Sequence, residues 1–173
     1  MAGIQWKLPE TLLPIYEYWR GKRAGADLPS RSRIDPDEVP HLKPYLMILQ
    51  AIGGGEDFRY RFMGDAVIQA TGVDCTGKRM TEVLRSGPYL DYLLGLNREV
   101  VAERRALYSE SSFRSDRLSN RWTCRVILPL SQTGRSVDGL VAAQVFGGLS
   151  QFTPAPPFSE MVDFEEGVRV PLD

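Results

Sequence analysis

The chain has 173 residues, of which 43% are hydrophobic, 25% charged and 10% aromatic, and its formal net charge is −1 at neutral pH. This composition is typical of a soluble globular domain and excludes disorder over most of the length, because disordered chains combine low hydrophobicity with high net charge. No run of about 18 apolar residues indicates a transmembrane helix, and the N-terminal residues lack the pattern of a secretory signal peptide. We therefore expect a cytoplasmic protein with no membrane partner.

The basic residues are mostly arginine, with 17 arginines against 4 lysines. A nearly neutral chain without a strongly basic segment is not typical of nucleic-acid-binding proteins, so we expect no nucleic-acid partner. Arginine prefers planar, bidentate contacts to carboxylates and phosphates. The excess of arginine fits either solvated surface charge or a site that binds an anion, and the sequence leaves both interpretations open.

An amphipathic helix is predicted near the N-terminus, at residues 10–20. Its apolar face has the i, i+3, i+4, i+7 spacing and consists of Leu12, Ile15, Tyr16 and Trp19. The indole of Trp19 packs either on this chain's own sheet or on a helix of a partner. We expect a homodimer that forms through these four residues.

A second, shorter helix is predicted to begin at Asp35, where several helix-start signals coincide. Asp35 is a good N-cap, Pro36 occupies the first helical position and Glu38 can complete a capping box. Ile34 and Val39 occupy the two positions of a hydrophobic staple.

The rest of the chain alternates between strand and helix patterns. Strands are expected at 46–52, 58–63, 107–113, 122–130 and 140–146. Helices are expected at 65–71, 80–84 and 90–105, all between the second and third strands. This order predicts an α+β fold with a five-stranded antiparallel sheet. We divide the chain into an N-terminal helical extension (1–44), one domain (45–149) and an acidic, proline-containing tail (150–173) that is either an extended arm or disordered.

Two of these elements have a clear side-chain pattern. In the strand at 122–130, Trp122, Cys124, Val126 and Leu128 alternate with Thr123 and Arg125, and Arg121 just before the strand continues the polar set. The alternation predicts a half-buried antiparallel strand with a polar side that includes Thr123 and Arg125. On the helix at 90–105, one face is expected to consist of Leu90, Leu93, Leu94, Asn97 and Val101.

The order of elements resembles that of a PAS domain. It is most similar to a stand-alone PAS-like family of bacteria, mainly alphaproteobacteria, long described as a domain of unknown function. The resemblance is carried by the segments Ile15–Arg20, Leu28–Pro36, Phe58–Gly64 and Gly72–Gly77. It implies a sheet curled around a small cavity and a role in sensing a ligand, binding a partner or forming dimers. The residues after the last expected strand are too few for an effector domain, so we expect the protein to act by binding another protein.

No motif for catalysis or for a metal is found, and no enzymatic activity is expected. The single histidine, His41, follows Pro40 at the end of the short helix, away from the expected cavity, so haem is not expected. Cys75 lacks the neighbours that flavin-binding light sensors of the PAS class have around their cysteine, so flavin is not expected either. Cys75 and Cys124 are interpreted as passive small residues. The cofactor therefore stays unknown.

A ligand cavity is predicted from strand alternation and from the face of the long helix. Its candidate lining residues are Leu93, Asn97, Trp122, Cys124, Val126, Gln144 and Phe146. Asn97 and Gln144 place polar groups on apolar faces, where they either pair with the backbone or a buried water or orient a small ligand.

The sequence therefore predicts a PAS-type sensor or adaptor that acts by protein–protein interaction and is gated by a small ligand in an apolar cavity. Two alternatives stay open. One is a purely structural interaction module with a closed core. The other is a small α+β cone enzyme of the ketosteroid-isomerase type, which would need a buried Asp or Glu as its base.

Overall fold

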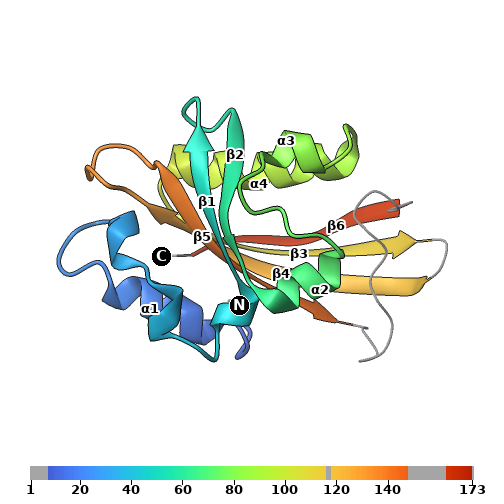
Figure 1. The fold of residues 1–173 in the computed structure, drawn as a ribbon, viewed down its shortest axis with the longest axis horizontal. Helices are drawn as coiled ribbons and strands as arrows, with labels where there is room; N and C mark the ends of the chain where they lie inside the picture. The colour runs from blue at the N-terminus through green and yellow to red at the C-terminus, as the bar shows by residue number, and fades with distance from the viewer. Residues whose placement is uncertain (1–7, 116–117, 148–162, 173) are drawn as a thin grey trace, which may run out of the picture.

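The computed structural model describes residues 8–115, 118–147 and 163–172 (Figure 1). The helices are α1 (Leu13–Gly21), α2 (Asp65–Thr71), α3 (Met80–Val83) and α4 (Pro88–Glu103). The strands are β1 (Leu46–Ile52), β2 (Asp57–Met63), β3 (Ala106–Ser115), β4 (Leu118–Leu130), β5 (Gly139–Gly147) and β6 (Asp163–Leu172). No helix in this part of the chain combines the length and the apolar character that crossing a bilayer requires.

The strands form one antiparallel sheet in the order β2-β1-β5-β4-β3-β6. The first five strands confirm the predicted α+β fold, with α2, α3 and α4 inserted between β2 and β3. The sixth strand is an addition, because β6 lies within the segment predicted to be an extended arm or disordered. It pairs with β3 and forms an edge of the sheet.

The two faces of the sheet are covered by different parts of the chain. Figure 1 shows α1 and its following turns on one side of the sheet, and α3 and α4 on the other. We call these the outer face and the helix-facing side, respectively. Because both sides are covered, β4 is buried along Thr123–Leu130 in an unbroken run. This differs from the half-buried strand that alternation predicted.

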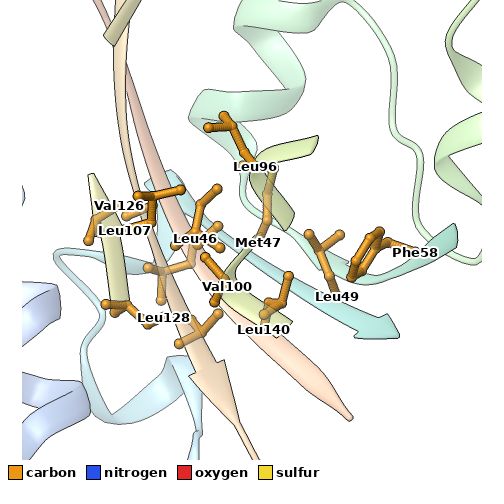
Figure 2. Close-up of a cluster of buried hydrophobic side chains, with 14 of the residues drawn as sticks. Leu46, Met47, Leu49, Phe58, Leu96, Val100, Leu107, Val126, Leu128 and Leu140 are labelled. Atoms are coloured by element: carbon orange, nitrogen blue, oxygen red, sulfur yellow. The ribbon is translucent and has the colours of Figure 1, made fainter. Parts of the chain in front are cut away.

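Hydrophobic core residues lie on both faces of the sheet. One layer lies between the sheet and α4 and includes Met47, Leu96, Val100 and Leu107, which Figure 2 labels. The other layer lies between the sheet and α1, where Trp19 is buried against β4. On α4 the buried positions are Leu90, Tyr92, Leu94, Leu96, Asn97 and Val100. Leu93 and Val101, which the periodicity placed on this face, are only partly buried. The observed buried face is therefore rotated slightly from the predicted one.

The segment predicted as a short helix from Asp35 forms only a 3-10 turn, at Pro36–Glu38. It is the second of three such turns, the others being Arg31–Arg33 and Lys43–Tyr45. Asp35 caps the second turn, accepting a hydrogen bond from the Asp37 N–H at 2.9 Å. The capping box does not form, because Glu38 accepts a hydrogen bond from the Tyr18 hydroxyl and forms an ion pair with Lys22. The contacts to α1 thus replace those that would have extended this turn into a helix.

Candidate functional site

The strand register divides the predicted cavity residues between two faces of the sheet. Cys124 pairs with Val145 and Val126 with Ala143, whereas Thr123 pairs with Phe146. Opposed residues of an antiparallel pair point to the same face, and neighbours along a strand to opposite faces. Consequently Trp122, Cys124 and Val126 lie on the outer face, and Gln144 and Phe146 lie on the helix-facing side. The prediction that these five line one cavity is wrong.

Asn97 and Gln144 are both buried, at 3% and 5% exposure. Among the described residues, the contact of the Asn97 amide is a long one, 3.8 Å to the Met80 sulfur. The Gln144 amide donates to the Thr123 hydroxyl at 2.9 Å, and that hydroxyl donates to the Val145 carbonyl at 2.9 Å. For Gln144, partners within the protein are therefore identified. Leu93 and Phe146 are partly buried, whereas the indole of Trp122 is 51% exposed.

Buried polar side chains form two rows across the helix-facing side of the sheet. In one row, Ser109 of β3 opposes Arg125 of β4, which opposes Gln144 of β5. In the next row, Ser111 opposes Thr123. All five side chains are nearly inaccessible to solvent. Tyr92 of α4 packs on this group, and its hydroxyl contacts Ser109 and Arg125. We call this group the inner polar cluster: Tyr92, Ser109, Ser111, Thr123, Arg125 and Gln144.

Arg125 is the only charged member of the inner polar cluster, and it is 2% exposed. Its Nη1 donates to the Tyr92 hydroxyl at 3.2 Å and to Ser109 at 3.5 Å, and its Nη2 donates to Ser111 at 3.3 Å. Its Nε is buried and has no hydrogen-bond acceptor in the described part of the chain. Charge-assisted N–H···O bonds are usually about 2.7–2.9 Å, so the guanidinium is weakly satisfied.

No carboxylate among the described side chains neutralises Arg125. The contrast with Arg169 is clear, because that guanidinium bonds to Glu99 and to Glu166 at 2.7 Å each. Arginine stays protonated in proteins, and burying an uncompensated charge costs several kcal/mol even after relaxation. The Tyr92 ring, 5.5 Å from the Arg125 Cζ, offsets only about 0.5–2 kcal/mol of this.

Two further tyrosines lie within electrostatic range of Arg125. Burial raises the pKa of Tyr89 above its ordinary value, and the positive charge of Arg125 acts in the opposite direction. Burial also raises the pKa of Tyr60 strongly, again with Arg125 opposing it. Both phenols are therefore neutral hydroxyl groups at physiological pH. The described surroundings of Arg125 therefore supply hydroxyls and rings, and none of these described groups carries a negative charge.

Three of the four residues predicted to form a dimer interface are inside the chain's own core. Leu12, Ile15 and Trp19 are 1%, 1% and 0% exposed. The Trp19 indole donates a hydrogen bond to the Pro129 carbonyl at 2.9 Å. The sequence left open whether Trp19 packs on the chain's own sheet or on a partner, and in the structure it packs on the chain's own sheet. Tyr16 is partly buried and stacks beside Trp19.

Two pockets open at the surface, away from the inner polar cluster. One, of about 270 Å³, lies between the end of α4 and the start of β3, with Glu99 and Arg105 in its wall. The other, of about 380 Å³, lies beside the β1–β2 turn and includes Arg104 and Arg135. Arg104 donates to the carbonyls of Arg135 and Gly134, which fixes its guanidinium in that loop.

The other side chains that could take part in catalysis or metal binding either have hydrogen-bond partners or lie apart from one another. The buried Asp57 accepts hydrogen bonds from the Thr81 hydroxyl and from the Phe58 N–H. Cys75 and Cys124 are free and buried, and burial raises the pKa of both thiols. In the part of the chain that the structure describes, no three potential ligands cluster into a metal site. His41 is exposed.

Apart from Gln144, the inner polar cluster was not predicted from the sequence, because alternation along β4 places Thr123 and Arg125 on a polar, solvent-facing side. One signal was present. Arg125 is the single charged residue in Trp122–Leu130, and a strand with apolar residues on both faces is covered on both sides. A charged residue in the middle of such a strand is therefore expected to be buried on either face.

The strand order β2-β1-β5-β4-β3, with helices between the second and third strands covering one side, defines the fold of a PAS domain. The family model PAS_5, described as a PAS domain, matches residues 8–138. This range covers most of the chain and includes α1, so the chain belongs to the PAS domain family. A comparison with curated proteins finds no match. PAS domains are generally sensory and interaction modules without enzymatic activity.

Proposed function

We propose that this chain is a non-catalytic cytoplasmic sensor that binds a small ligand between the sheet and α4 and reports it by contact with another protein. The observation that carries the proposal is the inner polar cluster, a set of buried polar groups in an otherwise apolar core. Binding sites typically combine an apolar lining with a few convergent polar groups. Two free, buried cysteines are consistent with a reducing compartment.

The ligand-contacting residues in this proposal are those on the helix-facing side. Leu93 and Asn97 come from α4, and Gln144 and Phe146 from β5. Asn97 is the most informative, because the contact of its amide among the described residues is a weak one to a sulfur, and a ligand would give it a stronger partner. Cys124 and Val126 lie on the opposite face and have no part in the site.

The test is native mass spectrometry of freshly purified protein, searching for a co-purified small molecule. We expect an adduct on the wild-type chain and a lower adduct fraction for Asn97→Leu, which keeps the branched shape of the side chain but removes the amide. Cys124→Ala is the matched control, since Cys124 is equally buried on the other face, and it should keep the wild-type adduct fraction. Equal occupancy in Asn97→Leu would contradict a ligand role for this residue.

We also propose that the protein partner includes a second copy of the chain. The exposed side of α1 carries Leu13, which is 41% exposed, while the opposite side of α1 packs on the sheet. Light scattering at about 100 μM is expected to give a dimer mass, a concentration well above the dissociation constant of a micromolar complex. Leu13→Ser should lower the mass if α1 contributes. A monomer mass for the wild-type chain contradicts the proposal.

A further inference from the structure

We propose that Arg125 is the recognition group for the ligand and that the ligand is a small organic acid bound through its carboxylate. This inference rests on the proposed sensory function and specifies its ligand class. The starting observation is a guanidinium that is 2% exposed, has an unpaired Nε and has no described carboxylate partner.

The donor inventory of Arg125 leaves room for one bidentate anion. A guanidinium carries five N–H groups: two on Nη1, two on Nη2 and one on Nε. The Tyr92 and Ser109 hydroxyls bond each other, so they accept from Nη1 on the same side, and Ser111 accepts from Nη2. The N–H on Nε and one N–H on Nη2 have no acceptor among these residues. These two nitrogens are neighbours on the planar group, and a carboxylate accepts from such a pair with both oxygens.

The surrounding residues hold Arg125 in place instead of neutralising it. Hydroxyls of Tyr92, Ser109 and Ser111 surround the guanidinium on the Nη side, and the Tyr92 ring lies 5.5 Å from Cζ. A charge that is fixed before binding loses little side-chain entropy when a ligand arrives. The arrangement is therefore that of a preorganised receptor for one negative charge.

The remainder of the ligand would meet neutral groups. Tyr60 and Tyr89 are kept in the phenol form by burial, and Asn97 and Gln144 supply amides. Because the described surroundings contain a single uncompensated positive charge, they favour one carboxylate over a doubly charged phosphate. The charge balance thus selects a monoanion, or one carboxylate of a larger acid.

Two experiments on the full chain test the inference. In the first, a titration with sodium acetate, sodium benzoate or sodium succinate is followed by NMR of the arginine Nε–H resonances, with sodium chloride at matched ionic strength. We expect the Arg125 resonance to shift with at least one carboxylate and not with chloride, because its Nε gains an acceptor. This readout uses the wild-type protein and does not depend on the folding of a variant.

In the second experiment, the melting temperature is measured with the same acids and with sodium phosphate. At ten times the dissociation constant we expect a rise of about 3–5 °C for the wild-type chain, no rise for Arg125→Gln and a smaller one for Arg125→Lys, which keeps the charge but loses the planar fork. Arg61→Gln is the matched control, because Arg61 is exposed and bonds to Gln50. It should behave as wild type.

The outcomes separate this inference from the proposed function. A co-purified molecule that is retained by Arg125→Gln but lost from Asn97→Leu leaves the sensor proposal intact and overturns the carboxylate site. A response to phosphate alone also overturns the carboxylate assignment. If no acid shifts the Arg125 resonance and no mass adduct depends on Arg125, the inference is wrong. Absence of any adduct from the wild-type chain counts against both.

Discussion

Replacing Trp19 with alanine is expected to lower the free energy of unfolding by about 3–5 kcal/mol, the range for truncating a large buried aromatic residue. The indole is completely buried between α1 and the sheet, and its N–H donates to the Pro129 carbonyl. The substitution would leave a cavity and an unpaired carbonyl in β4. A domain of this size is stable by only about 5–15 kcal/mol, so the loss is a large part of the total.

Urea unfolding measures this loss of stability. Two further variants in α1 show how much of it comes from the lost volume and how much from the lost hydrogen bond. Trp19→Phe keeps most of the volume and loses the hydrogen bond, so we expect a loss of about 1–2 kcal/mol. Leu13→Ala changes an exposed residue of the same helix and should stay within about 0.5 kcal/mol of wild type. If Trp19→Ala cost no more than Leu13→Ala, α1 would not be packed on the sheet in solution. The dimer interface expected from the sequence would then regain its basis.

The position of α1 illustrates what an amphipathic pattern establishes. The spacing of Leu12, Ile15 and Trp19 predicted a helix with one buried face, and all three are buried. The same spacing gives no information on which surface does the burying, because a sheet of the chain and a helix of a partner both satisfy it. The helix was therefore predictable, whereas its partner was not.

The missed strand β6 has the opposite cause. In the described part of the sheet it pairs with β3 alone, and six of the eight residues from Glu165 to Leu172 are exposed. Apolar residues alternate only over the short stretch Val168–Leu172, after the acidic residues Glu165 and Glu166, which suit an edge that must not pair further. Most of the strand is held by backbone pairing with β3, and backbone pairing leaves little trace in the side-chain pattern.

The candidate site was only partly predictable for a third reason. Asn97 and Gln144 were found because polar residues on apolar faces stand out. Arg125 was predicted to be exposed, because alternation along β4 indicates one solvent-exposed face. The run from Thr123 to Leu130 is buried on both sides, so alternation in β4 separates two packed layers. Which residues face α4 and which face α1 can be decided only when the register of β3, β4 and β5 is known.

Gly64→Ala is expected to destabilise the domain by about 3 kcal/mol, the upper part of the usual range for overpacking. Gly64 connects β2 to α2, and its N–H donates to the Leu46 carbonyl at 2.8 Å. Its φ of −75° is accessible to every residue, so backbone strain is not the reason for glycine here. A Cβ at this position would lie 2.3 Å from the Lys43 carbonyl oxygen and 2.4 Å from that of Pro44.

Both obstacles are backbone atoms of the turn Lys43–Tyr45, which a change of rotamer cannot remove. That turn leads into β1, so relief of the clash must move β1, β2 or the start of α2. Gly95→Ala in α4 is the matched control, because a Cβ there meets nothing within 4 Å and the helix gains roughly 0.5–1 kcal/mol. Urea unfolding of the two variants should therefore give shifts of opposite sign. Equal shifts would contradict the prediction, because they would show that a Cβ at Gly64 does not clash with the Lys43 and Pro44 carbonyls.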